Sequence, residues 1–157
     1  MPAWFWLVAI PLFAVSWWMF LMWLIAHAVG WSALARHYRN VEPFEGKKHH
    51  FCSGKISFGN YGNCLIVGAN SDGLYLHVFL LFRVGHPPLF IPWTDLTPRV
   101  KRLWFFEWLE FEPSRVPKVK VRFPAALARE LATDANRAWE PKSGYVLDRQ
   151  ESNDNEG

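Results

Sequence analysis

The chain has 157 residues, of which 51% are hydrophobic, and a formal net charge of +3. This length allows one domain and an appendage. The charge excess is modest and forms no recognition motif, so nucleic acid is not indicated as a partner. Two cysteines, Cys52 and Cys64, are too few for a disulfide scaffold.

The first thirty residues predict a membrane-spanning helix. Residues 2–29 contain no Asp, Glu, Lys or Arg. A helix that rises about 1.5 Å per residue crosses a hydrocarbon core of about 30 Å in roughly 20 residues. The sequence Ala-His-Ala at 26–28 is also typical of a signal-peptide cleavage site, but the start lacks Lys and Arg and the apolar run is too long. A buried helix of a soluble protein would need a larger domain around it.

The basic residues beside this span indicate its orientation. The N-terminal flank has no basic side chain, whereas Arg36, Arg39, Lys47 and Lys48 follow the span. The positive-inside rule therefore places the N-terminus outside and the C-terminal domain in the cytoplasm. The same four residues are candidate contacts to lipid headgroups.

A second helical pattern follows the span. Trp31, Leu34, Ala35 and Tyr38 fall on one helical face, and Arg36 and Arg39 lie off it. We expect this helix to leave the bilayer through the headgroup region. Residues 3–39 are therefore assigned to the transmembrane and juxtamembrane helix, and residues 40–50 to a linker.

Several tryptophans lie too deep in the span for the aromatic belt at the membrane surface. Trp17, Trp18 and Trp23 point to different sides, because successive helical residues are about 100° apart. We expect one side to contact a membrane protein or a second copy of the chain and the others to face lipid. The candidate side consists of Phe13, Trp17, Phe20 and Leu24.

Residues 51–139 predict an antiparallel sheet that is closed by a C-terminal helix, an α+β class. Strands are expected at 51–60, 64–70, 74–83, 89–93 and 118–123, with one or two more within 100–112. Pro124 opens a helix whose apolar stripe includes Leu127, Leu131 and Ala135. The run 74–83 is nearly all apolar, so part of both faces of that strand should be covered, by the membrane surface, the juxtamembrane helix or a partner. Residues 140–157 predict an acidic disordered tail.

The stretch from 73 to 96 carries a resemblance to a known fold family. Its pattern consists of Gly73, Leu74 and Leu76, followed by Pro88, Leu89, Ile91, Pro92, Trp93, Asp95 and Leu96. Over residues 51–139 the chain resembles the bacterial PH-like and GRAM-like domains, in which a β-barrel or sandwich is capped by a C-terminal helix. The whole layout is similar to small bacterial inner-membrane proteins with one span. The resemblance implies a scaffold that binds lipid headgroups, peptides or proteins, and it does not imply catalysis.

Residues that carry chemistry are present without a pattern that indicates catalysis. His49, His50 and Cys52, with Cys64 twelve residues later, match no common zinc spacing. His86, before Pro87, is expected in a turn. Glu110 and Glu112 share a strand face and are expected to pair with Lys or Arg across the sheet. We therefore expect no metal, no cofactor, no small-molecule substrate and no enzymatic activity, and a small membrane enzyme is a distant alternative.

The predicted last strand places Lys118, Lys120 and Arg122 on one face. Such a face is either solvated or a contact to anionic lipid, where each basic residue contributes about 1 kcal/mol. The sequence thus favours a membrane-tethered interaction module, an adaptor or accessory subunit that docks a protein at the cytoplasmic face of the bacterial inner membrane. The alternative is a domain that binds or senses anionic lipid surfaces.

Overall fold

The computed structural model describes residues 3–103, 106–136 and 138. Two helices come first, α1 (Ala3–Val29) and α2 (Trp31–Tyr38). The strands are β1 (Lys48–Ile56), β2 (Gly59–Ala69), β3 (Gly73–Val78), β4 (Leu89–Pro92), β5 (Leu96–Leu103), β6 (Phe106–Pro113) and β7 (Val121–Pro124). Two 3-10 helices, η1 (Leu80–Phe82) and η2 (Trp93–Asp95), interrupt them, and α3 (Ala125–Asp134) follows β7.

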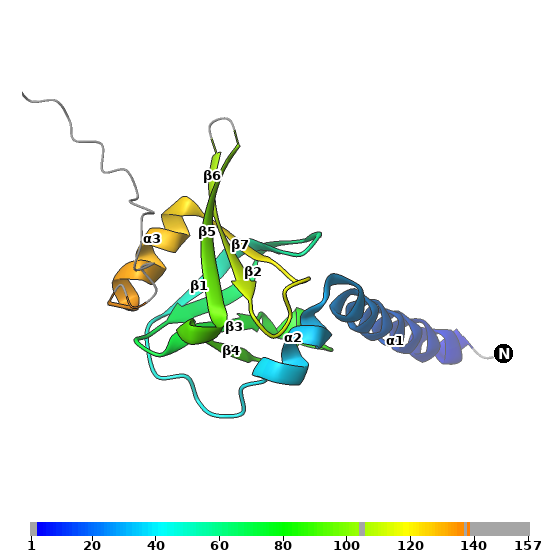
Figure 1. Ribbon diagram of the computed structural model, residues 1–157. Helices are drawn as coiled ribbons and strands as arrows, with labels where there is room; N and C mark the ends of the chain where they lie inside the picture. The colour runs from blue at the N-terminus through cyan, green and yellow to red at the C-terminus, as the bar shows by residue number, and fades with distance from the viewer. Residues whose placement is uncertain (1–2, 104–105, 137, 139–157) are drawn as a thin grey trace, which may run out of the picture.

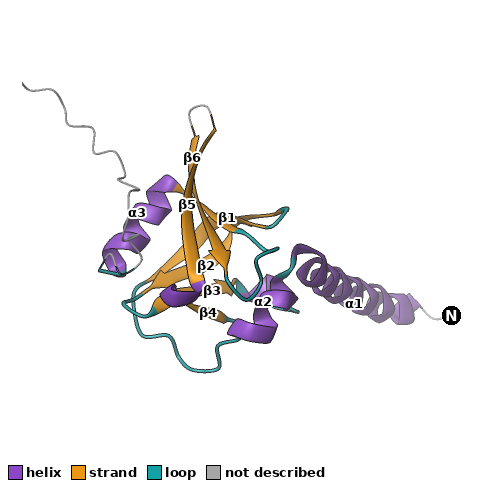
Figure 2. Ribbon diagram, viewed as in Figure 1, coloured by secondary structure: helices purple, strands orange, loops and turns teal. Residues whose placement is uncertain are grey.

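The seven strands form one antiparallel sheet in the order β4-β3-β2-β1-β7-β6-β5. The sheet curls until it is nearly closed, and η2 joins its two end strands, β4 and β5 (Figure 2). Helix α3 packs on β2, β6 and β7, while α1 leaves the domain on the other side (Figure 1). The predicted α+β class, with an N-terminal apolar helix, an antiparallel sheet and a C-terminal helix, is confirmed.

Helix α1 lies within the predicted first thirty residues and is long and apolar enough to cross a membrane, with a mean hydropathy of 2.0. Most of its side chains are exposed, and its burial is confined to the C-terminal part. There Ala26 and Val29 belong to the hydrophobic core of the domain. Val29 lies against Gly59, where an added Cβ would come within 2.7 Å of it. The end of α1 is therefore packed into the domain.

Helix α2 is a core element of the domain. The predicted apolar face is confirmed, but Trp31 and Leu34 are fully buried and Tyr38 is 4% exposed, so this face packs on the sheet. Gly30 turns the chain between the two helices with φ of +96°, a left-handed conformation that favours glycine. The apolar face of α2 therefore contacts the sheet, and the passage of this helix through the headgroup region stays a prediction.

The apolar run 74–83 forms a shorter strand than predicted. Strand β3 ends at Val78, and residues 80–82 form η1. The inward side chains of β3 are fully buried, and on its outer face the Tyr75 ring stacks on Phe44 at 4.7 Å. Part of both faces of the strand is covered as expected, but the 40–47 loop, which covers Tyr75, is not among the expected covers.

Several other boundaries differ from the prediction. Strand β1 begins at Lys48, and the last strand begins only at Val121, so that Lys118 and Lys120 lie in the preceding turn and loop. The segment 100–112 falls in two strands, as one of the expected alternatives has it. Leu131 of α3 is buried as predicted, and so is Ala135, which directly follows the helix. The expected tail at 140–157 lies outside the described residues.

A polar pair occupies the core where α2 meets the sheet. His86, predicted as a turn residue, is 1% exposed and packs against Trp31 with ring centroids 5.1 Å apart. Its Nδ1 lies 3.0 Å from the Val84 carbonyl oxygen, to which only a protonated nitrogen can donate. Its Nε2 then accepts from the Tyr61 hydroxyl at 3.0 Å. This neutral tautomer agrees with burial, which lowers the pKa of His86.

The packing of α2 yields a stability prediction. Leu34→Ala removes a fully buried side chain and should lower the free energy of unfolding by about 2–5 kcal/mol. Thermal unfolding of the full chain in mild detergent, followed by circular dichroism, measures the loss. His37→Ala, at an exposed position of the same helix, serves as the control. An unchanged melting temperature for Leu34→Ala would mean that α2 does not belong to the core.

Candidate functional site

The outer face of α1 is the aromatic surface that the sequence predicted as a contact, and it consists of Phe13, Trp17, Phe20 and Leu24. All four side chains are exposed. The Phe13 and Trp17 rings lie 6.4 Å apart, and those of Trp17 and Phe20 lie 6.0 Å apart. The rings therefore form a continuous row along the helix.

This outer face lies opposite the side of α1 that contacts the domain. Trp18, Met22, Ala26 and Val29, which pack against the domain, fall within roughly 80° of one another at about 100° per residue. By the same count the four residues of the outer face fall within roughly 60°, centred about 190° away. One side of α1 thus contacts the protein's own domain, and the other is exposed.

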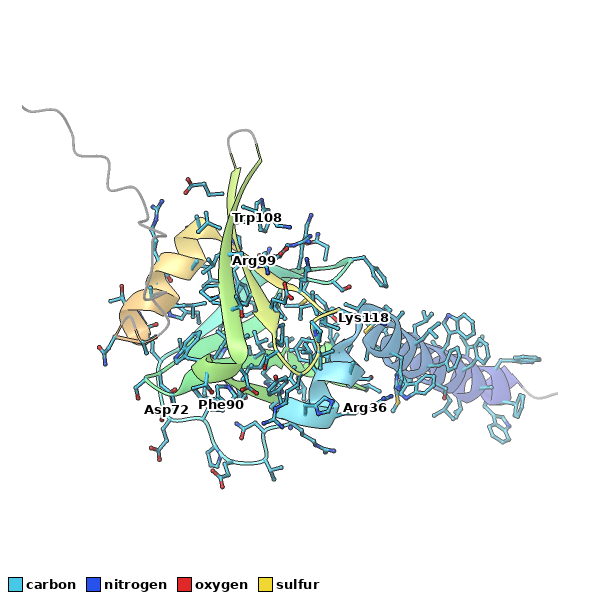
Figure 3. All side chains as sticks on the ribbon, in the orientation of Figure 1. Arg36, Asp72, Phe90, Arg99, Trp108 and Lys118 are labelled. Atoms are coloured by element: carbon cyan, nitrogen blue, oxygen red, sulfur yellow. The ribbon has the colours of Figure 1, made fainter. Side chains whose placement is uncertain are left out.

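Two of the candidate headgroup residues lie at the α1 end of the domain. Lys118 is exposed, and its neighbour Val119 packs against Gly30 at the junction of α1 and α2. Arg36 is exposed on α2. Figure 3 shows the labelled side chains of Lys118 and Arg36 on the α1 side of the sheet.

The other candidate basic residues are spread over the domain. Arg39 is exposed at the end of α2, where its backbone bridges Leu89 of β4. The Lys47 amine lies 3.9 Å from Asp134 of α3, and the Lys48 amine lies 5.5 Å from the centre of the Tyr75 ring. The structure therefore does not gather the predicted headgroup residues on one face.

Lys120 and Arg122 are engaged by a buried carboxylate. Glu110 of β6 has no exposed side-chain surface. Its Oε2 accepts a hydrogen bond from Arg122 Nε at 2.6 Å, and its Oε1 lies 3.3 Å from Lys101 Nζ and 3.6 Å from Lys120 Nζ. The predicted pairing of Glu110 and Glu112 with basic residues across the sheet is confirmed, since Glu112 also meets Arg99 at 3.7 Å.

The cations around Glu110 determine its protonation state. Burial by itself would raise the pKa of this carboxyl, but the hydrogen bond from Arg122 and the positive charges of Arg122 and Lys101 together lower the pKa below its ordinary value. Glu110 is therefore ionised at neutral pH. Two of the three basic residues predicted for a lipid-binding face thus already have an anionic partner within the domain.

The histidine and cysteine positions suggest structural roles. His49 lies on β1 and contacts α3, with Nε2 2.6 Å from Asp134 Oδ2 and Nδ1 3.1 Å from Glu130 Oε2. Cys52 and Cys64 are free thiols, and burial raises the pKa of both. Among the described residues, no group of three or more His, Cys, Asp or Glu side chains has the geometry to hold a metal ion.

An open depression of about 480 Å³ lies between the 40–45 loop and the β2–β3 turn. It is lined by Asn40, Glu42, Pro43, Phe44, Glu45, Asn70, Asp72 and Phe90. Phe44 and Phe90 lie 6.2 Å apart, and three carboxylates surround them. Figure 3 places Asp72 and Phe90 on the side away from α1.

Sequence reasoning missed this depression because it assigned residues 40–50 to a linker. The available signal was the sequence Glu-Pro-Phe-Glu at 42–45, in which an aromatic residue stands between two acids. Its partners from the β2–β3 turn and β4 are distant in sequence and are brought together only by the sheet.

No protein-family model, no curated protein and no solved structure matches this chain.

The environment of Glu110 yields a pH prediction. A carboxyl whose pKa is lowered by folding stabilises the fold above its unfolded pKa, and this stabilisation is lost as the pH falls through the folded value. Glu110→Gln should therefore cost about 1–3 kcal/mol at neutral pH, and the difference from the unaltered chain should shrink as the pH falls from about 6 toward 3. Denaturant titrations across this range measure both quantities.

Glu112→Gln provides the comparison for this experiment, because its partner Arg99 is more than half exposed and such pairs contribute about 0–1 kcal/mol. Equal effects of the two substitutions at all pH values would contradict the importance of the buried cluster.

Proposed function

We propose that this protein is a single-span membrane protein whose PH-like domain docks a protein partner at the cytoplasmic face of the bacterial inner membrane. The span would be α1, and the nearly closed antiparallel sheet with a helix after its last strand is compatible with a PH-like domain. In this proposal the protein is an adaptor or accessory subunit, and its activity is binding.

The observation that carries the proposal is the attachment of α1. Its apolar N-terminal part is exposed, whereas Ala26 and Val29 near its end are built into the domain core. Cleavage after Ala28 would remove Ala26 from that core and leave Val29 as a chain end. This packing favours a helix that is retained, and a retained helix of this hydropathy needs lipid around it.

The outer face of α1 supports a contact within the membrane. An anchor needs only apolar side chains, but this face carries a row of aromatic rings on the side turned away from the domain. Association of helices in lipid depends on close packing, since lipid tails are as apolar as the helix itself. A transmembrane helix of a partner, or a second copy of α1, is therefore the occupant that we propose for this face.

The lipid-binding alternative has weaker support. Lys120 and Arg122 face Glu110, and Lys47 lies near Asp134. Arg36 and Lys118 remain exposed at the α1 end of the domain. If α1 spans the membrane, these two side chains would lie near the phosphate groups of the lipids. They fit an auxiliary contact to anionic lipid that accompanies the span.

Retention and orientation of α1 are tested together in cells. A reporter that is active only in the cytoplasm should be active when fused after Gly157, and one that is active only outside should be silent. An N-terminal epitope tag should remain on the membrane-bound protein, because α1 is retained. Activity of the outside reporter alone, or loss of the tag, would contradict the proposed arrangement.

The outer face is tested by the triple substitution Phe13→Leu, Trp17→Leu and Phe20→Leu. Apolarity is kept, so membrane insertion should be unchanged, but the aromatic row is lost and recovery of a co-purified partner or second copy in mild detergent should fall. Quantitative mass spectrometry and cross-linking of the tagged full chain measure the recovery.

A matched control carries three substitutions at exposed positions on the domain-facing side of α1: Val8→Leu, Val15→Leu and Met19→Leu. By helical position these residues lie roughly 100–180° from the outer face. Equal loss with both triple variants, or no loss with either, would reduce α1 to an anchor.

A further inference from the structure

We propose that the loop Phe79–Arg83, which contains η1, is a second membrane element that inserts into the hydrocarbon of the leaflet beside the domain. The inference rests on the proposed membrane span of α1. It assigns the bilayer itself as the occupant of an exposed apolar surface on the domain.

The loop runs alongside α1. The indole Nε1 of Trp18 donates to the Leu81 carbonyl oxygen at 3.2 Å, and the Trp18 ring lies 5.9 Å from that of Phe82. Further along, Gly85 lies against the helix, where an added Cβ would be 3.1 Å from the Ala26 Cβ. The loop therefore follows α1 from Ala26 back to Trp18, a rise of about 12 Å along the helix axis.

The length of α1 sets the depth of this contact. A span that ended before Trp18 would consist of residues 3–17 and measure about 22 Å. This length is too short to cross a hydrocarbon core of about 30 Å. A span that begins at Ala3 reaches the other surface near Met22, so Trp18 lies about 6 Å inside the hydrocarbon. A later start or a tilt would place Trp18 deeper. Any crossing by α1 therefore brings the Leu81 and Phe82 backbone to bilayer depth.

The side chains of the loop suit that environment. Leu80 is 69% exposed and Leu81 is 61% exposed. Burial of a leucine side chain yields about 1.5–3 kcal/mol, which neither residue obtains from the protein fold alone. Residues 73–82 contain no Asp, Glu, Lys or Arg, and Arg83 at the end of the loop is exposed. A long arginine side chain can extend its charge toward the headgroups.

Several backbone groups of the loop have partners within the protein, as a position in lipid requires of polar groups. The Phe79 amide donates to Cys64 at 2.8 Å, and η1 adds bonds from Phe82 to Phe79 and from Arg83 to Leu80. The Leu81 carbonyl accepts from the Trp18 indole. This last bond satisfies two polar groups at once, and it explains a tryptophan that lies below the aromatic belt.

Two exposed rings extend the apolar surface around the loop. Phe51 sits at a β-bulge of β1 with φ of +56°, an unusual conformation for a bulky residue, and its ring lies 5.9 Å from that of Phe79. Phe58 is exposed in the turn beside Gly59, which contacts Val29 at the end of α1. These rings stand where the domain would meet the headgroups.

The depth of the loop is tested with the full chain in phosphatidylcholine vesicles without any partner. Nitroxide labels are placed at Leu80→Cys, Leu81→Cys, Val15→Cys and Ser71→Cys in a Cys52→Ala, Cys64→Ala background. Collisions with oxygen, which concentrates in hydrocarbon, are compared with collisions with a water-soluble nickel chelate. Val15 reports on the span, and Ser71 lies in the turn at the other end of β3, about 20 Å from the loop.

We expect the Leu80 and Leu81 labels to favour oxygen, as the Val15 label does, and the Ser71 label to favour nickel. Nickel collisions at Leu81 equal to those at Ser71, with Val15 still protected, would overturn the insertion and leave the span intact. Nickel collisions at Val15 would instead overturn the span. A Leu81 label that neither reagent reaches would indicate cover by a second copy, which also overturns insertion into lipid.

The Trp18 hydrogen bond has its own test in the same vesicles. Trp18→Phe keeps an aromatic ring but removes the indole N–H donor. The Leu81 label should therefore become more mobile, and its spectrum should become narrower. Trp17→Phe, on the outer face, should leave the spectrum unchanged. If the alanine background does not fold, the native thiols can remain, because burial raises the pKa of both and slows their labelling. Equal spectra for the two variants would overturn the role of the Trp18 bond in holding the loop.

Discussion

The arrangement of the whole chain depends on one packing interaction, the burial of the α1–α2 junction in the end of the curled sheet. Ala26 and Val29 precede the left-handed turn at Gly30, and Trp31 and Leu34 follow it, and all four side chains belong to one core. Because a close-packed core resists displacement, the direction of α1 relative to the domain is determined by this packing. A flexible tether would leave that direction open.

A fixed direction gives each surface of the domain a defined position. The aromatic row of α1 points away from the domain, and the Leu80–Phe82 segment lies along the opposite side of the helix. The depression near Phe44 and Phe90 lies on the side of the domain away from α1. In the proposed orientation, one surface meets a helix within the bilayer, one meets lipid, and one remains open to water.

The basic residues show where sequence reasoning about charge stops. Alternation along 118–123 indicated a basic face, yet β7 places Arg122 opposite Glu110 in the neighbouring strand, and Lys101 and Lys120 approach the same carboxylate. Counting charges along the chain cannot reveal this, because the pairing depends on the register between β5, β6 and β7. These basic side chains pair with Glu110 within the domain, so they are less available to an anionic lipid. The same pairing balances the charge of the buried Glu110 carboxylate.

The sequence by itself determined the features that depend on local composition and period. They are the apolar helix at the N-terminus, the apolar face of α2, the α+β class, and the pairing of Glu110 and Glu112 with basic residues. Only the tertiary structure decided what those faces contact. It buried α2 in the sheet, ended β3 at Val78, covered Tyr75 with Phe44, and brought Trp18 to Leu81 across 63 residues. The physical reason is that the periodicity of apolar residues indicates which side of a helix or strand avoids water. Which segment packs on that side depends on contacts between residues far apart in the chain.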